Sequence, residues 1–226
     1  MKTIGSGILS WIKHAVQEYS EELYQSMYHE KDPIKKTFCF APILPKPKFD
    51  NHQIELSGNY IQIIFSFYNY NYAFRIYNSF VGQLHKKFHL NRNSMTLIQA
   101  YILPEEDIQT SKIKIKLSSP MIVRKHDRET RKDTYYCFER EDFKTYLDIN
   151  ILEQMKAEGL DASLLDGFEI KPIQAKKVVM PVYEKMIECS IGSFELIGKK
   201  ELLNYLYRAG MGAKKGLGFG MFNLIS

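Results

Sequence analysis

Hydrophobic residues near the start of the chain recur every three or four positions. Ile8, Ile12 and Ala15 follow this spacing, which continues to Met27 and predicts one buried helix face. Ser20 is followed by two glutamates, a pattern typical of a new helix start, because a serine hydroxyl caps free amides and acids favour the first turn. We therefore predict two consecutive helices with a break near Ser20.

The rest of the first half alternates between extended and helical patterns. Residues 36–44 predict a strand, and residues 60–68 alternate apolar with polar positions as a second strand. Helical spacing returns over 74–88, and 94–103 is again extended. The predicted order is helix, strand, strand, helix, strand.

The second half adds one strand to that order. It predicts a strand at 112–123, a helix at 139–158, strands at 168–180 and 182–196, a helix at 199–208 and a strand at 217–225. The order β-α-β-β-α-β is the ferredoxin-like unit. The first half fits this unit without its opening strand, because only Met1–Ile4 precede its helix. A truncated or shifted start, or a strand supplied from elsewhere, would each account for the difference.

We therefore predict an α+β fold of two tandem ferredoxin-like (βαββαβ) units, the first lacking its opening strand. The expected domains are residues 1–108 and 109–226.

Composition limits the class of protein. The chain has 226 residues, of which 45% are hydrophobic and 25% charged, so a folded globular protein is expected. The uncharged stretch 56–74 carries several serines and asparagines, which excludes it as a membrane span. Three scattered cysteines without a CxxC pair argue against disulfides and a zinc site, and favour a cytoplasmic protein. Lys and Arg total 31 against 26 Asp and Glu, and this net charge of +5 permits a polyanionic partner.

A glycine-rich run at residues 210–220 lies between the last predicted helix and the last strand. Nucleotide-binding glycine loops lead from a strand into a helix, so this run is neither a P-loop nor a dinucleotide fingerprint. Glycines can adopt positive φ and offer N–H groups to an anion, and Lys214 and Lys215 would add positive charge at the tip. A tight turn with two solvated lysines is the simpler interpretation.

The spacing G-h-G-x5-G-h-G in this run, in this place of a double ferredoxin-like protein, resembles the C-terminal signature of the CRISPR repeat-processing endoribonucleases of the RAMP superfamily. The segments IKLSSPMIV (115–123), FELIG (194–198) and GFGM (218–221) also resemble that family. The resemblance implies binding of CRISPR repeat RNA. It also implies that the loop glycines Gly210, Gly212, Gly216, Gly218 and Gly220 contact RNA.

The family resemblance also implies catalytic residues. The family often places a histidine at the end of the first helical segment and a lysine about six residues later, where this chain has His29 and Lys35. A tyrosine is usual some fifteen residues earlier, where this chain has His14. Histidine suits proton transfer near pH 7, and lysine suits the charge on the phosphate. His29 could equally be an ordinary polar residue at a helix end.

The implied reaction is metal-independent attack by the 2′-hydroxyl, which cleaves precursor crRNA within repeats and leaves 5′-hydroxyl and 2′,3′-cyclic phosphate ends. No cofactor and no metal are expected. On a continuous helix, His14 and His29 would lie about 22 Å apart, so joint action requires the break near Ser20.

A second basic stretch spans residues 124–132, with five cations against two anions in a predicted loop. It is either a solvated loop or a grip on the RNA backbone. The candidate RNA-binding cations outside the glycine run are Lys36, Arg124, Lys125, Arg128, Arg131 and Lys132. The alternative function is a non-catalytic RNA-binding RAMP subunit of a CRISPR interference complex. Such subunits, or a second copy of the chain, are the protein partners left open.

Overall fold

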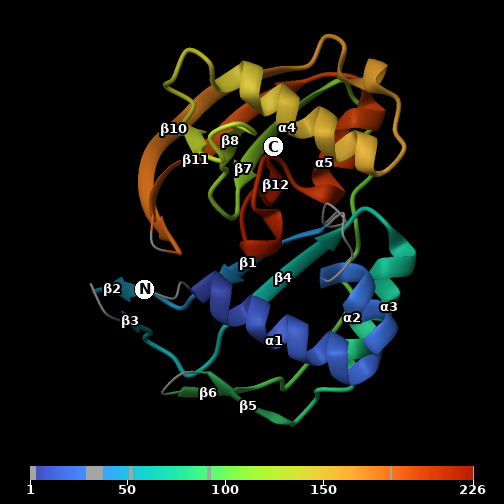
Figure 1. Cartoon of the computed structure of the whole chain (residues 1–226), viewed down its shortest axis with the longest axis vertical. Helices are drawn as coiled ribbons and strands as arrows, with labels where there is room; N and C mark the ends of the chain where they lie inside the picture. The colour runs from blue at the N-terminus through green and yellow to red at the C-terminus, as the bar shows by residue number, and fades with distance from the viewer. Residues whose placement is uncertain (1–3, 29–37, 51–52, 91–92, 184, 226) are drawn as a thin grey trace.

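The computed structural model describes residues 4–28, 38–50, 53–90, 93–183 and 185–225. Two units lie one above the other in Figure 1, the C-terminal unit above and the N-terminal unit below. The tandem ferredoxin-like architecture predicted from the sequence is confirmed. The missing opening strand of the first unit stays a prediction, because residues 1–3 lie outside the described ones.

The N-terminal unit begins with helices α1 (Ile4–Tyr19) and α2 (Glu21–Tyr28). The predicted face is buried, with Ile8, Ile12 and Ala15 at most 1% exposed. The predicted break is also confirmed, because the Ser20 hydroxyl accepts a hydrogen bond from the Leu23 amide at 3.2 Å and so starts α2.

The N-terminal sheet pairs β1 (Phe38–Ile43) with β4 (Gln62–Phe67) in antiparallel register. Helix α3 (Tyr70–Val81) follows, started by the Asn69 side chain, which accepts from two amides of the first turn. Small hairpins complete the unit: β2 (Lys48–Phe49) with β3 (Ile54–Glu55), and β5 (Lys87–Leu90) with β6 (Asn93–Thr96).

Two predicted boundaries in this unit are wrong. Helix α3 ends at Val81 rather than continuing to residue 88, and Phe88 lies on β5. Of the strand predicted over 94–103, only the beginning belongs to a strand, β6, which ends at Thr96. In a βαββαβ sheet the fourth strand pairs with the first. Residues 98–103 stand in the place of the fourth strand. No described strand precedes α1, so in the described part of the chain these residues have no first strand to pair with.

The C-terminal unit has a complete ferredoxin-like sheet in the order β10-β11-β7-β12. All neighbouring strands are antiparallel. The elements are β7 (Lys112–Leu117), α4 (Phe143–Ala157), β10 (Glu169–Val182), β11 (Lys185–Ile197), α5 (Lys200–Ala209) and β12 (Phe222–Ile225). An inserted hairpin, β8 (Val123–His126) with β9 (Asp133–Tyr136), precedes α4, and a 3₁₀ turn η1 (Ala162–Leu165) follows it.

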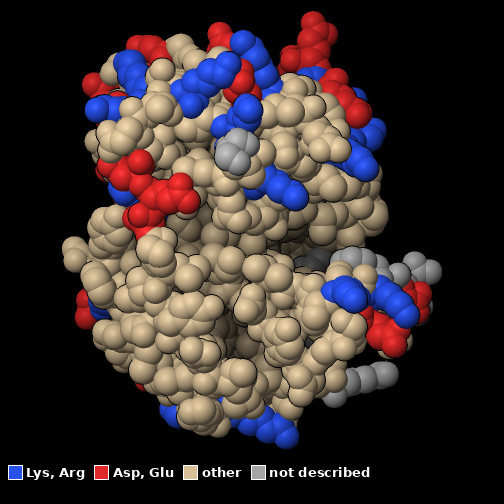
Figure 2. Space-filling model, turned by 180° about the vertical axis from the view of Figure 1, so that it is seen from behind, with Lys and Arg blue, Asp and Glu red and all other residues tan. Residues whose placement is uncertain are grey.

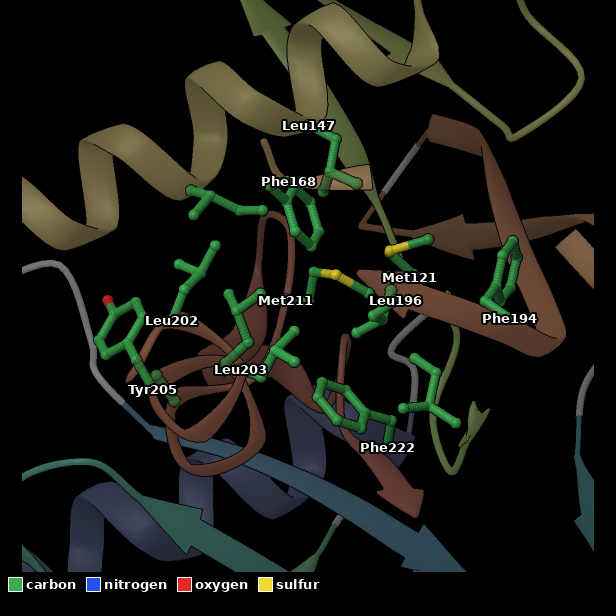
Figure 3. Close-up of a cluster of buried hydrophobic side chains, with 14 of the residues drawn as sticks. Met121, Leu147, Phe168, Phe194, Leu196, Leu202, Leu203, Tyr205, Met211 and Phe222 are labelled. Atoms are coloured by element: carbon green, nitrogen blue, oxygen red, sulfur yellow. The ribbon is translucent and has the colours of Figure 1, made fainter. Parts of the chain in front are cut away.

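Figure 3 shows the core beneath the two C-terminal helices. Leu147 of α4, Leu202 of α5, Leu196 of β11 and Phe222 of β12 belong to this one cluster, and all four are at most 1% exposed. Each such side chain contributes about 1.5–3 kcal/mol by leaving water. This core fixes both helices against the sheet, and therefore fixes the loop that follows α5.

The β10–β11 hairpin is much longer than the sheet that holds it. Strand β11 pairs with β7 only over Ser193–Ile197, so the rest of the hairpin projects and curves down in Figure 1. Gly192 marks the departure at φ +109, where a Cβ would lie 2.1 Å from the Gln174 carbonyl oxygen. The sequence placed the turn at Pro181, but Pro181 pairs with Met186 inside the hairpin, and the turn comes two residues later.

Candidate functional site

The glycine run forms part of the contact between the two units, beside helix α5. Its 3₁₀ turn η2 (Lys215–Leu217) packs against α1 and β1. Gly210 and Gly218 have φ of +75 and +87, and a Cβ would lie 2.7 Å from Cys39 Cβ and 2.8 Å from the Phe40 ring respectively. Glycine is needed at these positions for its positive φ and because β1 approaches the backbone so closely.

Several amides of the run are used inside the protein. Met211 donates to the Gly220 carbonyl at 2.9 Å, Ala213 to Ile122 at 2.7 Å, and Gly220 to Pro120 at 2.9 Å. A Cβ at Gly220 would lie 2.0 Å from the Met211 oxygen. The amides of Met211, Ala213 and Gly220 therefore close the loop on itself and on residues 120–122, and these three amides are not part of a cradle facing an anion.

Lys215 differs most from its prediction as a charge at an exposed tip. It is only 5% exposed, and its ammonium donates to Gln154 Oε1 at 2.9 Å. Burial lowers the pKa of Lys215 to about 8, against smaller opposite effects of Cys39 and Glu158. Lys215 thus ties the glycine run to α4 and does not face solvent.

Lys214 directly precedes the η2 turn and is half-buried, in left-handed conformation at φ +58. Its ammonium is 5.9 Å from the centre of the Tyr135 ring and 5.9 Å from that of Tyr183. Burial, and then the nearby Arg124, lower the pKa of Lys214. The structure therefore brings Lys214 and Arg124, two of the predicted RNA-binding residues, together.

The basic stretch predicted as a loop is partly a hairpin. Arg124 and Lys125 lie on β8. The Asp133 carboxylate on β9 lies 3.5 Å from Arg124 Nη1 and 2.8 Å from His126 Nδ1. Lys125 lies over the Tyr146 ring at 5.3 Å. The turn cations Arg128, Arg131 and Lys132 are exposed.

The catalytic candidates are only partly described. His14 is exposed on α1, with its ring 5.3 Å from that of Phe88. His29, Lys35 and Lys36 lie outside the described residues. The neighbour of His14, Lys13, reaches the Tyr28 ring at 4.8 Å, so the end of α2 returns to α1.

Charge is unevenly distributed over the surface. Seen from behind in Figure 2, charged side chains gather over the C-terminal unit, whereas the N-terminal unit shows a broad face with few charges.

Within the described ranges, no group of three or more His, Cys, Asp or Glu could hold a metal ion. No described helix is long and apolar enough to cross a bilayer. The three cysteines are buried and unpaired.

Sequence reasoning missed Tyr135, Tyr183 and Lys185. Tyr183 is 58% exposed at the turn of the β10–β11 hairpin. An aromatic residue between two strand-like segments was the available signal, but in a chain with 15 tyrosines it does not stand out.

The paired ferredoxin-like units and the glycine-rich connection before the last strand define a RAMP-type protein. The family model of the CRISPR associated protein Cas6, C-terminal, matches residues 103–224, and the chain belongs to this family. A search of curated proteins finds no match.

Solved structures share the whole fold. A Cas6-related gene product from Pyrococcus furiosus superposes with a TM-score of 0.84 at 21% identity, covering 98% of this chain and 90% of that one. A RAMP protein binding different RNA substrates gives 0.80 at 21% identity, covering 98% and 91%. A Cas6 product complex gives 0.69 at 13% identity, covering 98% and 93%. At these identities the likeness concerns the fold.

Proposed function

We propose that the protein is an endoribonuclease that binds CRISPR repeat RNA and cleaves precursor crRNA within each repeat without a metal ion. The observation that carries this proposal is the position of the glycine run. The family model covers this run, and its η2 turn packs against α1, the helix that carries His14.

The reaction needs three groups. A base removes the 2′-hydroxyl proton while that oxygen attacks phosphorus, an acid protonates the departing 5′-oxygen, and a cation stabilises the charge on the phosphorane. In this proposal His29 is the acid or base, Lys35 supplies the charge, and His14 is a second proton-transfer group. The exposed position of His14 on α1 leaves its ring nitrogens open to a substrate.

RNA would be held by the surface cations rather than by the glycines. Lys214, Lys125 and Arg124 present charge from the glycine run and β8, and the exposed Arg128, Arg131 and Lys132 extend this basic surface. Lys36, which lies outside the described residues, is a further candidate. The glycines act indirectly, because they let the loop pack on β1.

The two domains that we propose are residues 1–108 and 109–226. Ile108, at the boundary, exchanges two hydrogen bonds with Asn204 of α5.

The experiment is incubation of the purified chain with repeat RNA in EDTA. We expect one cut per repeat, a 2′,3′-cyclic phosphate upstream and a 5′-hydroxyl downstream. RNA with a single 2′-deoxy nucleotide at the cut should bind equally and stay intact. Cleavage of the deoxy substrate, or strict Mg²⁺ dependence with 5′-phosphate ends, would contradict the proposal, because both indicate metal-assisted hydrolysis.

The second candidate is a non-catalytic RNA-binding RAMP subunit of an interference complex. The structural likeness to a RAMP protein binding different RNA substrates favours it. The same assay separates the two functions, since a binding subunit would retard repeat RNA on a gel without cutting it.

A further inference from the structure

Three cations and two aromatic rings meet where the glycine run, the β8–β9 hairpin and the β10–β11 hairpin come together. The ammonium of Lys214 lies near the rings of Tyr135 and Tyr183, 5.9 Å from each centre. Arg124 of β8 and Lys185 of β11 are close enough for their charges to act on Lys214. The tip of the hairpin curves toward the glycine run in Figure 1.

The described residues of this cluster carry an excess of positive charge. Asp133 is the carboxylate that acts on Lys214, and it already accepts hydrogen bonds from His126, Arg124 and the Tyr135 hydroxyl. Among the described residues, Asp133 is thus the carboxylate that acts on both Arg124 and Lys214. Like charges held this close repel each other, so a bound anion would be stabilised here.

Tyr183 offers an aromatic face beside that charge. Its side chain is 58% exposed, and it adopts φ +55, a conformation uncommon for a residue other than glycine. The hairpin beneath it is anchored, because Val182 and Ile187 are buried in a cluster with Phe219 of the glycine run. The hairpin that carries the ring is thus anchored, while the ring itself is exposed.

We propose that this cluster binds one unpaired nucleotide of RNA, with the base stacked on Tyr183 and the adjoining phosphate held by Lys214, Arg124 and Lys185. Aromatic rings bind bases by stacking, whatever the base, and cations bind the phosphate, so the combination fits a single-stranded segment. The identity of the ligand as RNA rests on the proposed function. The site would hold RNA on the C-terminal unit, beside the η2 turn that packs against α1 and β1.

The test measures binding of an eight-nucleotide oligouridylate and of an abasic oligoribonucleotide of the same length, by fluorescence anisotropy at several salt concentrations. We expect Tyr183→Ala to weaken oligouridylate binding about fivefold to hundredfold, with no effect on the abasic probe. Tyr183→Phe should bind as the wild type. Lys214→Ala should weaken both probes and flatten the slope of log K against log salt by about 0.7.

The matched control is Val179→Ala, since Val179 is 50% exposed on the same hairpin. Tyr183→Leu keeps the bulk without the aromatic face and replaces the alanine variant if that variant fails to fold. Three outcomes would overturn the proposal: no binding of oligouridylate by the wild type, the same affinity for Tyr183 and Val179 variants, or equal loss on both probes.

Failure of this site is distinguishable from failure of the proposed function. If the wild type does not cut repeat RNA but Tyr183→Ala selectively loses oligouridylate, the nucleotide site stands and the nuclease proposal falls. If repeat RNA is cut and Tyr183→Ala binds both probes as the wild type does, the nuclease proposal stands and this site falls.

Discussion

The ammonium group of Lys13 lies 4.8 Å from the centre of the Tyr28 ring, although the two residues are fifteen positions apart. On one straight helix they would be about 22 Å apart. The contact exists because the chain reverses at Ser20 between α1 and α2. Each residue of the pair directly precedes a candidate catalytic histidine in the sequence, His14 or His29, and of these two histidines the structure describes His14.

Ser20→Ala should weaken this reversal. The Ser20 hydroxyl accepts from the Leu23 amide, and loss of a helix cap typically costs about 1 kcal/mol. We expect urea denaturation to show a lower free energy of unfolding by about that amount. Ser26→Ala is the control, since the Ser26 hydroxyl only donates to a carbonyl within α2. Equal effects of the two substitutions would contradict a capping role.

His29→Ala should abolish cleavage of repeat RNA while leaving the affinity within a few-fold. A positioned acid or base typically contributes about 10²- to 10⁴-fold in rate, and RNA binding depends mainly on cations elsewhere. The measurement is single-turnover cleavage together with a binding titration. His89→Ala is the matched control, because His89 is exposed on β5. Undiminished cleavage by the His29 variant would remove His29 from the mechanism.

Local pattern was sufficient for much of the fold. The helical face of α1, the break at Ser20 and the whole β-α-β-β-α-β order of the second unit follow from the periodicity of apolar residues. Errors occurred where pairing with distant strands decides the structure. Residues 98–103 have extended-type apolar content, but in the described chain they have no neighbouring strand to pair with.

The candidate site was less predictable for the same reason. Lys215 has the sequence context of a solvated turn lysine, yet its surroundings include Cys39 of β1 and Gln154 of α4, both distant in sequence. The contact of Lys214 with Tyr183 likewise depends on how far the β10–β11 hairpin projects. Local sequence determines the turn, whereas packing between units determines which lysine reaches solvent.

Gly218→Ala should be more destabilising than substitution of a glycine with similar backbone geometry. Gly218 has φ +87 and a Cβ there would meet the Phe40 ring at 2.8 Å, whereas Gly159 has φ +70 with nothing within 4 Å. We expect Gly159→Ala to cost about 1 kcal/mol from backbone strain alone. Gly218→Ala should cost about 1–3 kcal/mol more, because the contact between the units must open. Thermal unfolding of both variants checks this, and equal losses would show that β1 does not press on the loop.

Buried Lys215 should make stability depend on alkaline pH. Burial lowers the pKa of Lys215 from 10.5 to about 8 in the folded protein. Between these values the unfolded chain binds more protons than the folded one, so the free energy of unfolding should rise with pH across this window, by up to about 3 kcal/mol. Lys215→Met removes this contribution, while Lys185→Met, at an exposed site, retains it. Urea denaturation at pH 7.5, 9 and 10.5 measures the difference in slope between the two variants, which cancels the titration of the other lysines and tyrosines. Identical slopes would mean that the ammonium of Lys215 is solvated in the folded protein, and the tie between the glycine run and α4 would then be wrong.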